Sequence, residues 1–159
     1  EVLKTKNVDI FVVLLGNTVM IDSNLIDKSI DLLQSNPQAT AVCSVWKAGD
    51  DHPMRAMEIK DGYLFSHRSV IRQEGISTDR SSYFPAYFYD QGVWTFLASN
   101  LKTKNIGPAT WSWLGDKVIP LERDWITGRD INGPFDVKFH TNWNILKDTE
   151  TEFEIYENN

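Results

Sequence analysis

Two stretches of almost unbroken apolar residues, 8–15 and 39–46, are rich in β-branched side chains and predict strands covered on both faces. The segment between them has apolar residues at helical spacing, at Leu25, Ile26, Ile30 and Leu33. Asp22 or Ser23 can cap the start of this helix, and Pro37 ends it. The pattern therefore predicts a strand, a helix and a second strand in succession.

A strand–helix–strand unit of this length is typical of a right-handed crossover between parallel strands. A mostly parallel sheet of the α/β class is the predicted architecture. Ligands of such sheets bind near the carboxyl ends of the strands. Residues 16–20 follow the first predicted strand and so lie at such an end.

The pattern changes after the second predicted strand. Residues 54–59 and 63–65 flank Asp61-Gly62, a hairpin-turn sequence, and predict an antiparallel excursion from the sheet. Residues 66–82 are polar and rich in Arg and Ser. Because this stretch is longer than an ordinary connection, it is predicted to be a binding loop or a partner contact.

The second half of the chain is dense in aromatic residues. Residues 85–97 predict a strand pair that breaks near Asp90-Gln91-Gly92, and 117–121 predict a short strand. A turn-rich stretch at 124–134 precedes a weaker helical pattern at 141–153. Large rings fill a small α/β core, so most tryptophans are expected to pack inside; they include Trp94, Trp111, Trp113, Trp125 and Trp143.

The length of 159 residues fits one domain, with 42% hydrophobic and 24% charged residues. A net charge of -6 without a Lys/Arg block argues against a nucleic-acid partner but is compatible with a phosphorylated small molecule. Cys43 is the single cysteine, which rules out a disulfide within the chain. No apolar run approaches the length that spans a bilayer, so no membrane partner and a cytoplasmic location are expected.

Four segments, spread from about residue 8 to about residue 147, give the chain its likeness to a known family. They are Val12-Val13-Leu14-Leu15-Gly16-Asn17-Thr18, Asp51-His52-Pro53-Met54-Arg55, Arg72-Gln73 and Tyr89-Asp90-Gln91-Gly92-Val93-Trp94. In order and approximate spacing this set resembles the acylneuraminate (CMP-sialic acid) cytidylyltransferases. The resemblance covers the C-terminal two-thirds of that family's domain, and its N-terminal CTP-binding loop has no counterpart here.

The resemblance implies a Rossmann-like, GT-A-like nucleotidyltransferase fold in which residues 1–159 form one N-terminally truncated domain. Its mostly parallel sheet would carry an antiparallel dimerisation and substrate arm, residues 47–82, and a homodimer is expected. In this family the anomeric hydroxyl of an acidic sugar attacks the α-phosphorus of CTP, and pyrophosphate leaves. The implied function is transfer of CMP to a sialic-acid-like sugar for cell-surface polysaccharide.

The resemblance also implies binding residues. Asn17 and Thr18 are candidates for the nucleotide, beside a helix N-terminus that favours anions. The candidates for the sugar are Arg55, Arg72, Gln73 and Gln91. A guanidinium binds a carboxylate or a phosphate through two parallel hydrogen bonds, which suits an acidic sugar. No catalytic residue is assigned.

The family carries Asp-Ile-Asp before a short helix as magnesium ligands, and residues 136–141 are compared with that motif. Either Lys138 and His140 replace both aspartates, or Asp136 keeps the first position and Lys138 replaces the second. Asp136 is therefore the candidate ligand for Mg²⁺, a cation that prefers oxygen donors. His140 is a further candidate, as a general base or as a phosphate contact, with a structural role as the alternative.

Two functions remain open on the sequence. One is the cytidylyltransferase, and the other is a catalytically inactive sugar- or nucleotide-binding or scaffold homologue in which the triphosphate loop and the metal aspartates are lost. A glycosyltransferase is a third, weaker interpretation, because it would need an Asp-x-Asp metal motif after a strand and the sequence contains none.

Overall fold

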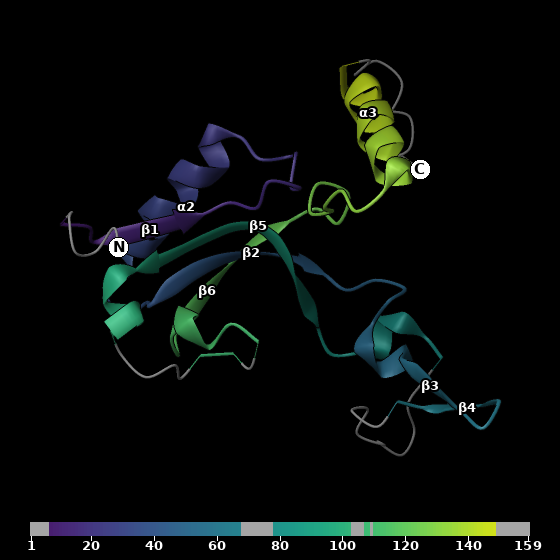
Figure 1. The fold of residues 1–159 in the computed structure, drawn as a ribbon. Coiled ribbons are helices and arrows are strands. Elements are labelled where there is room, and N and C mark those ends of the chain that lie inside the picture. The colour runs from purple at the N-terminus through teal and green to yellow at the C-terminus, as the bar shows by residue number, and fades with distance from the viewer. Residues whose placement is uncertain (1–6, 68–77, 103–106, 109, 149–159) are drawn as a thin grey trace.

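The computed structural model describes residues 7–67, 78–102, 107–108 and 110–148, and its centre is a mixed sheet of four strands. The strands lie in the order β1-β5-β2-β6 (Figure 1). Their bounds are Ile10–Val13 for β1, Ala41–Lys47 for β2, Tyr87–Leu97 for β5 and Val118–Arg123 for β6. The protein is thus of the α/β class, as predicted.

The prediction of a mostly parallel sheet is wrong for these strands. β5 runs antiparallel to both β1 and β2, and β2 and β6 form the one parallel pair of the described sheet. The predicted crossover does join two strands of the same direction, but β5 lies between them. β1 is therefore paired on one side only within the described residues, and its four residues are half-buried rather than covered on both faces.

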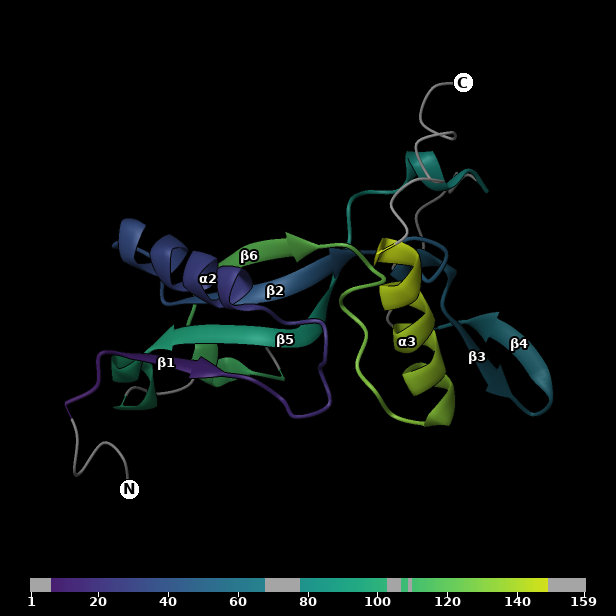
Figure 2. The same ribbon diagram turned by 90° about the horizontal axis from the view of Figure 1, so that it is seen from above.

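Helix α2, Ser23–Ser35, covers one face of this sheet (Figure 2). Asp22 caps it, because its carboxylate accepts the Leu25 amide at 2.8 Å, as the sequence predicts. The apolar side of the helix packs through Leu33 onto a cluster that contains Ala39, Val42 and Leu121. A hydrogen bond of 2.6 Å between the hydroxyls of Ser29 and Thr95 satisfies both groups inside this interface.

The opposite face of the sheet packs against the segment around the short 3₁₀ helix η4, Ser112–Leu114. The buried members of this cluster are Ala41, Cys43, Trp94, Phe96 and Leu114. Trp111 and Trp113 lie edge-on or tilted against Trp94, with ring centroids 5.4 and 5.5 Å away. These three tryptophans pack as the sequence predicts, whereas Trp125 is 42% exposed.

β5 is one strand of eleven residues, not the predicted pair. The feature that looks like a break is a bulge: the register with β2 shifts between Cys43 and Val45. On β5, Gln91 adopts a left-handed φ of 58° next to the buried Asp90 and Gly92. The turn-like sequence thus bends the strand without ending it.

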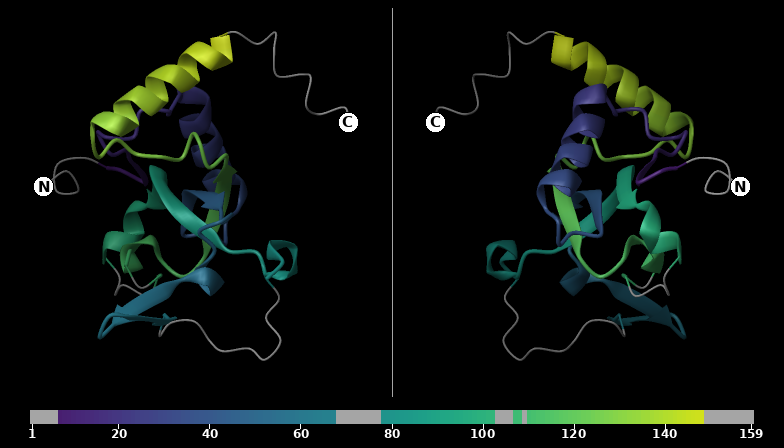
Figure 3. Two further views of the ribbon diagram at one scale, coloured as in Figure 1. Left: turned by 90° about the vertical axis from the view of Figure 1, so that its right-hand side faces the viewer. Right: turned by 90° about the vertical axis from the view of Figure 1, so that its left-hand side faces the viewer.

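The second sheet is a hairpin of β3, Met57–Lys60, and β4, Tyr63–Ser66. Asp61 and Gly62 join them with φ of 52° and 82°, as a type I′ turn requires, so the predicted hairpin is confirmed. The 3₁₀ helix η1, Pro53–Arg55, precedes it, and η2, Arg80–Ser82, follows. From here on the arm means residues 53–67, which lie within the predicted arm 47–82; they project from the four-stranded sheet (Figure 3).

Helix α3 spans Pro134–Asp148, so it begins earlier than the predicted 141–153. Pro134 suits the first helical turn, where no intrahelical donor is needed. The apolar spacing that the sequence shows therefore belongs to the second half of a longer helix. A fourth 3₁₀ helix among the described residues, η3 at Ala98–Lys102, follows β5. No helix among the described residues is both long and apolar enough to cross a membrane.

Candidate functional site

Three loops leave the sheet at one edge. β1, β2 and β6 run in the same direction, so residues 14–22, 48–56 and 124–133 all follow carboxyl ends at that edge. In Figure 1 this is the right-hand end of the sheet, with α3 above it and the arm below. Loops at such an edge are where α/β sheets bind ligands.

The first and third of these loops are joined through Asn17. Its side-chain amide donates to the carboxylate of Asp130 at 3.1 Å, and its carbonyl accepts the amide of Ile131 at 2.8 Å. A second, longer contact runs from the same side-chain amide to the Ile131 carbonyl. Asn17, predicted as a nucleotide contact, thus lies at the site edge beside a carboxylate.

Thr18, the other predicted nucleotide contact, closes the turn at the end of β1. Its hydroxyl donates to the Leu15 carbonyl at 2.7 Å and its amide donates to the same oxygen at 3.2 Å. The hydroxyl therefore shapes the loop that presents Asn17.

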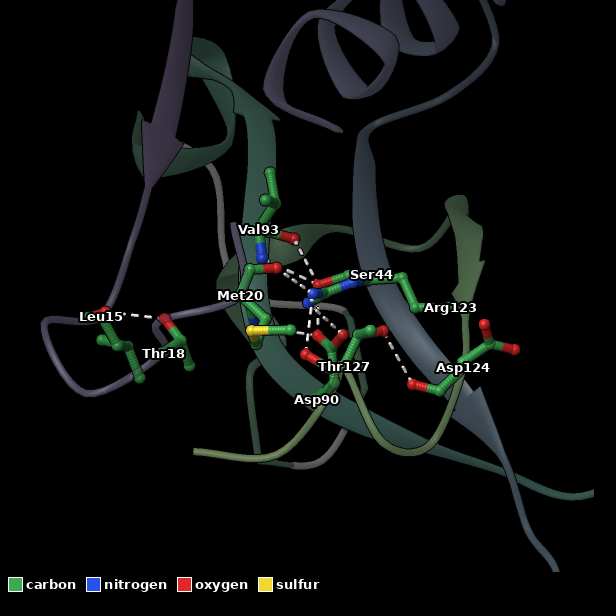
Figure 4. Close-up of polar contacts among 10 residues, drawn as sticks. Leu15, Thr18, Met20, Ser44, Asp90, Val93, Arg123, Asp124 and Thr127 are labelled. Carbon is green, nitrogen blue, oxygen red and sulfur yellow. Dashed lines mark hydrogen bonds and ion pairs between the residues drawn. The ribbon is translucent and has the colours of Figure 1, made fainter. Parts of the chain in front are cut away.

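A buried ion pair lies beneath the two loops. Arg123 Nη1 donates to Asp90 Oδ2 at 2.8 Å, and the two side chains are 7% and 0% exposed. The other terminal nitrogen, Nη2, donates to the carbonyls of Met20 and Thr127, the latter at 2.8 Å. Figure 4 shows these groups converging on the guanidinium from separate parts of the chain.

The second oxygen of Asp90 is also satisfied. It accepts the Gly92 amide at 2.8 Å and the hydroxyl of Ser44, which in turn accepts the Val93 amide at 2.7 Å. A Cβ on Gly92 would overlap Arg123 Nη1, so glycine is needed for the close approach. A Cβ on Gly128 would similarly lie 2.9 Å from Asp90 Cβ.

A cavity of about 490 Å³ opens between the start of α2 and the loop after β6. Its polar lining includes Asp22, Asn24, Lys28, Arg123 and Thr127. Because Arg123 is already engaged by Asp90, Lys28 is the lining cation outside the buried pair. The cavity is large enough for a small polar ligand.

A second cavity, of about 550 Å³, lies at the root of the arm and is lined in part by Lys47, Asp79 and Tyr83. His52, a member of the predicted sugar segment, is only 5% exposed there. Its Nδ1 accepts the Met54 amide at 3.2 Å, so Nε2 is the nitrogen that donates to the Phe84 carbonyl at 2.9 Å. His52 thus ties the start of the arm to the segment that enters β5.

Of the predicted sugar contacts, the structure describes Arg55 and Gln91. Arg55 lies at the root of the arm, where Nη1 is 3.4 Å from Asp50 Oδ1, and both side chains are exposed. Gln91 is half-buried at the bulge of β5. Arg72 and Gln73 lie outside the described residues.

Asp136 occupies the first turn of α3 and does not precede the helix, as the comparison with Asp-Ile-Asp required. Its Oδ2 accepts the amides of Asn132 and Gly133, both at 2.9 Å. This carboxylate caps α3 through Oδ2, and its assignment to magnesium stays a prediction. The segment that does precede the helix is Asp130-Ile131-Asn132. Among the described residues no group of three or more His, Cys, Asp or Glu side chains could hold a metal.

His140 is 3% exposed, and neither ring nitrogen has a hydrogen-bond partner among the described residues. Its ring lies 5.6 Å from that of Phe139. Such burial distinguishes it from an accessible general base.

One thiol near the site has a perturbed acidity. Burial, and then the negative charge of Asp90, raises the pKa of Cys43 to about 12. Burial and the neighbouring Cys43 raise the pKa of Tyr89 as well. Both groups therefore stay protonated at neutral pH.

Ser44, Asp90, Arg123 and Asp130 are absent from the sequence-based predictions of site residues. A signal existed for Asp90, a charge inside an aromatic strand, and for Ser44, a hydroxyl inside an apolar one. A buried charge requires a partner of opposite sign, but the pattern does not say which of the basic residues supplies it.

No protein-family model matches this chain, and no curated protein matches it either.

Proposed function

We propose that this chain is part of a Rossmann-like, GT-A-like cytidylyltransferase domain that transfers CMP from CTP to an acidic, sialic-acid-like sugar. The observation that carries the proposal is the junction of Asn17 with Asp130 and Ile131, where the loops after β1 and β6 meet. Asn17 belongs to the segment that the family resemblance assigns to the nucleotide, and Asp130 lies shortly before the segment 136–141 that was compared with the metal motif.

The start of α3 at Pro134 removes an objection to an enzyme. The comparison that set Lys138 against an aspartate of Asp-Ile-Asp used residues inside the helix. Asp130-Ile131-Asn132 lies directly before α3, and it keeps the first acid and has an amide in place of the second. Asp130 also contacts the predicted nucleotide loop, which Asp136 does not do in its role as a cap.

The residues present suit a magnesium nucleotide only in part. Mg²⁺ is often held by one or two carboxylates together with substrate phosphates, and Asp130 offers one such carboxylate. The metal would neutralise charge on the phosphates. Asn17 would hold the Asp130 carboxylate in place, and Lys28 in the neighbouring cavity would attract a phosphate.

The arm supports the proposed homodimer. Met57, Ile59, Tyr63, Leu64 and Phe65 expose between 50% and 77% of their surface on one hairpin. The register of the hairpin places Met57, Ile59 and Leu64 on one face and Tyr63 and Phe65 on the other. Exposed apolar side chains gathered in this way suit an interaction site. We propose that two copies pair through the arm, with Arg55 and Gln91 contributing to the sugar site from its root and from β5.

The second candidate is an inactive homologue that binds a sugar or a nucleotide without transferring it. Asn132 in place of an acid favours it, as does the lack of a three-ligand metal cluster within the described part of the chain.

Pyrophosphate release from CTP and N-acetylneuraminate with Mg²⁺ tests transfer, and calorimetry with CMP, with and without Mg²⁺, tests binding. We expect Asp130→Asn to weaken Mg²⁺-dependent CMP binding by about tenfold or more, since it removes a charge-assisted contact. Asp136→Asn is the matched control: it weakens a helix cap, costs about 1 kcal/mol of stability and leaves the Mg²⁺ dependence unchanged.

The result separates the candidates. CMP binding without pyrophosphate release supports the inactive homologue. The absence of heat with CMP at millimolar concentration contradicts both nucleotide-based functions, and equal effects of the two substitutions contradict the role of Asp130.

A further inference from the structure

The buried pair of Asp90 and Arg123 is unusual in where its hydrogen bonds go. Two of them, from Arg123 Nη2, end on carbonyls in loops: Met20 in the loop after β1 and Thr127 in the loop after β6. Neither carbonyl belongs to the hydrophobic clusters on the two faces of the sheet. The guanidinium therefore connects the sheet to the two loops that carry Asn17 and Asp130 (Figure 4).

A buried ion pair contributes little net stability to a fold. The loss of hydration of two charges offsets much of their attraction, and well-packed apolar replacements are often equally stable. In this chain several residues nevertheless accommodate the pair. Ser44 satisfies the second carboxylate oxygen, while Gly92 and Gly128 leave the space that the pair needs.

The planar guanidinium has the geometry for this task. It presents several N–H donors in a fixed fork, so that once Nη1 is held by Asp90, the direction of Nη2 is fixed as well. The two loop carbonyls then have defined positions relative to β5. A lysine, with one terminal nitrogen, cannot hold the carboxylate and both carbonyls in the same arrangement.

We propose that Arg123, oriented by Asp90, is the positioning residue of the candidate site: it fixes the relative positions of the loops 14–22 and 124–133 so that Asn17 contacts Asp130 and Ile131. The inference rests on the proposed function only in that the two loops are taken to bind the ligand. The contacts that position the loops are present without any ligand.

The test therefore uses amide hydrogen exchange in the ligand-free full chain. The reporter is the Ile131 amide, whose hydrogen bond of 2.8 Å to the Asn17 carbonyl closes the junction between the loops. The test variant is Asp90→Leu combined with Arg123→Met, which removes both charges and keeps apolar volume. We expect exchange at Ile131 to quicken at least about tenfold while the amides of Val42 and Thr95 in the sheet stay protected.

Arg123→Lys is the second variant, for the case in which the double variant does not fold. It keeps the charge beside Asp90, and we expect it to quicken exchange at Ile131 in the same selective way. Arg129→Met is the matched control, since Arg129 is exposed, stacks over Trp125 at 4.9 Å, and lies in the same loop as Thr127. We expect it to leave the Ile131 exchange unchanged.

Unchanged exchange at Ile131 in a folded variant overturns the proposal, and so does uniform loss of protection through the sheet in Arg123→Lys. Neither result depends on nucleotide binding. A failure of CMP to bind, with selective exchange still observed, therefore contradicts the proposed function and leaves the positioning role intact.

Discussion

Two arginine–aspartate pairs in this protein differ in almost every physical respect. At the carboxyl edge of the sheet, Arg123 and Asp90 are 2.8 Å apart and at most 7% exposed. At the root of the arm, Arg55 and Asp50 are 3.4 Å apart, with side chains 47% and 81% exposed. The first pair is part of a satisfied network between four segments, and the second lies in water.

The apolar side chains of the two regions show the same contrast. The sheet buries Leu114, Val42 and Val93 completely, while the arm leaves Ile59 77% exposed and Leu64 67% exposed. Among the described residues the sheet thus buries its apolar side chains within one chain, whereas the arm leaves apolar side chains exposed. The candidate site thus lies beside the buried sheet, whereas the arm exposes most of its large apolar side chains.

The largest expected effect is on the free energy of unfolding, and it differs between the two ion pairs. Arg123→Met leaves the fully buried Asp90 without its partner, so we expect the free energy of unfolding to fall by about 3–5 kcal/mol in urea titrations. Arg55→Met is the matched control and should cost no more than about 1 kcal/mol, because an exposed pair contributes little. Equal losses would contradict the distinction between the regions.

The next effect concerns association through the arm. Leu64→Asp introduces a charge into the exposed apolar hairpin, and we expect it to raise the dimer dissociation constant by about tenfold to a hundredfold in sedimentation experiments. Leu101→Asp is the control, since Leu101 is 48% exposed at η3, outside the arm. A monomeric wild-type protein at high concentration would show that the arm does not pair two copies.

The smallest effect on stability at neutral pH concerns Cys43. Its folded pKa of about 12 exceeds the ordinary value of 9.0, so at pH 8 native protein should react with a thiol reagent about a thousandfold more slowly than unfolded protein. The raised pKa contributes stability that is complete below pH 9 and is lost as the pH rises toward 12. Labelling of the native protein at the unfolded rate would show that the sheet face opens there.

Local elements of this fold could be predicted from sequence because each depends on neighbouring residues. Three such elements are α2, predicted from the helical spacing after Asp22, the hairpin, predicted from the turn at Asp61-Gly62, and β2, predicted from its apolar run. The start of α3 was not, because the apolar spacing is weak before residue 141 and the cap of Asp136 is a contact, not a periodicity. The comparison with the metal motif therefore fell on Asp136, which caps α3, and its role as a magnesium ligand stays a prediction.

The candidate site was predictable only in part. Asn17 was identified because it follows an apolar strand, yet its partner Asp130 lies 113 residues further along the chain. The sugar candidate Arg55 was identified from its motif, but it lies at the root of the arm. Contacts across such separations depend on how strands pair, and no local pattern encodes that pairing.

By itself, the sequence determined the α/β class, the capped helix α2, the hairpin of the arm and the packing of most tryptophans. The tertiary structure alone decided that β5 lies between β1 and β2, that Arg123 is the partner of Asp90, and that Asp130 rather than Asp136 lies at the site edge. The physical reason is that hydrophobic periodicity and turn chemistry depend on residues a few positions apart. Strand order and charge pairing are decided only when distant segments pack against one another and are desolvated.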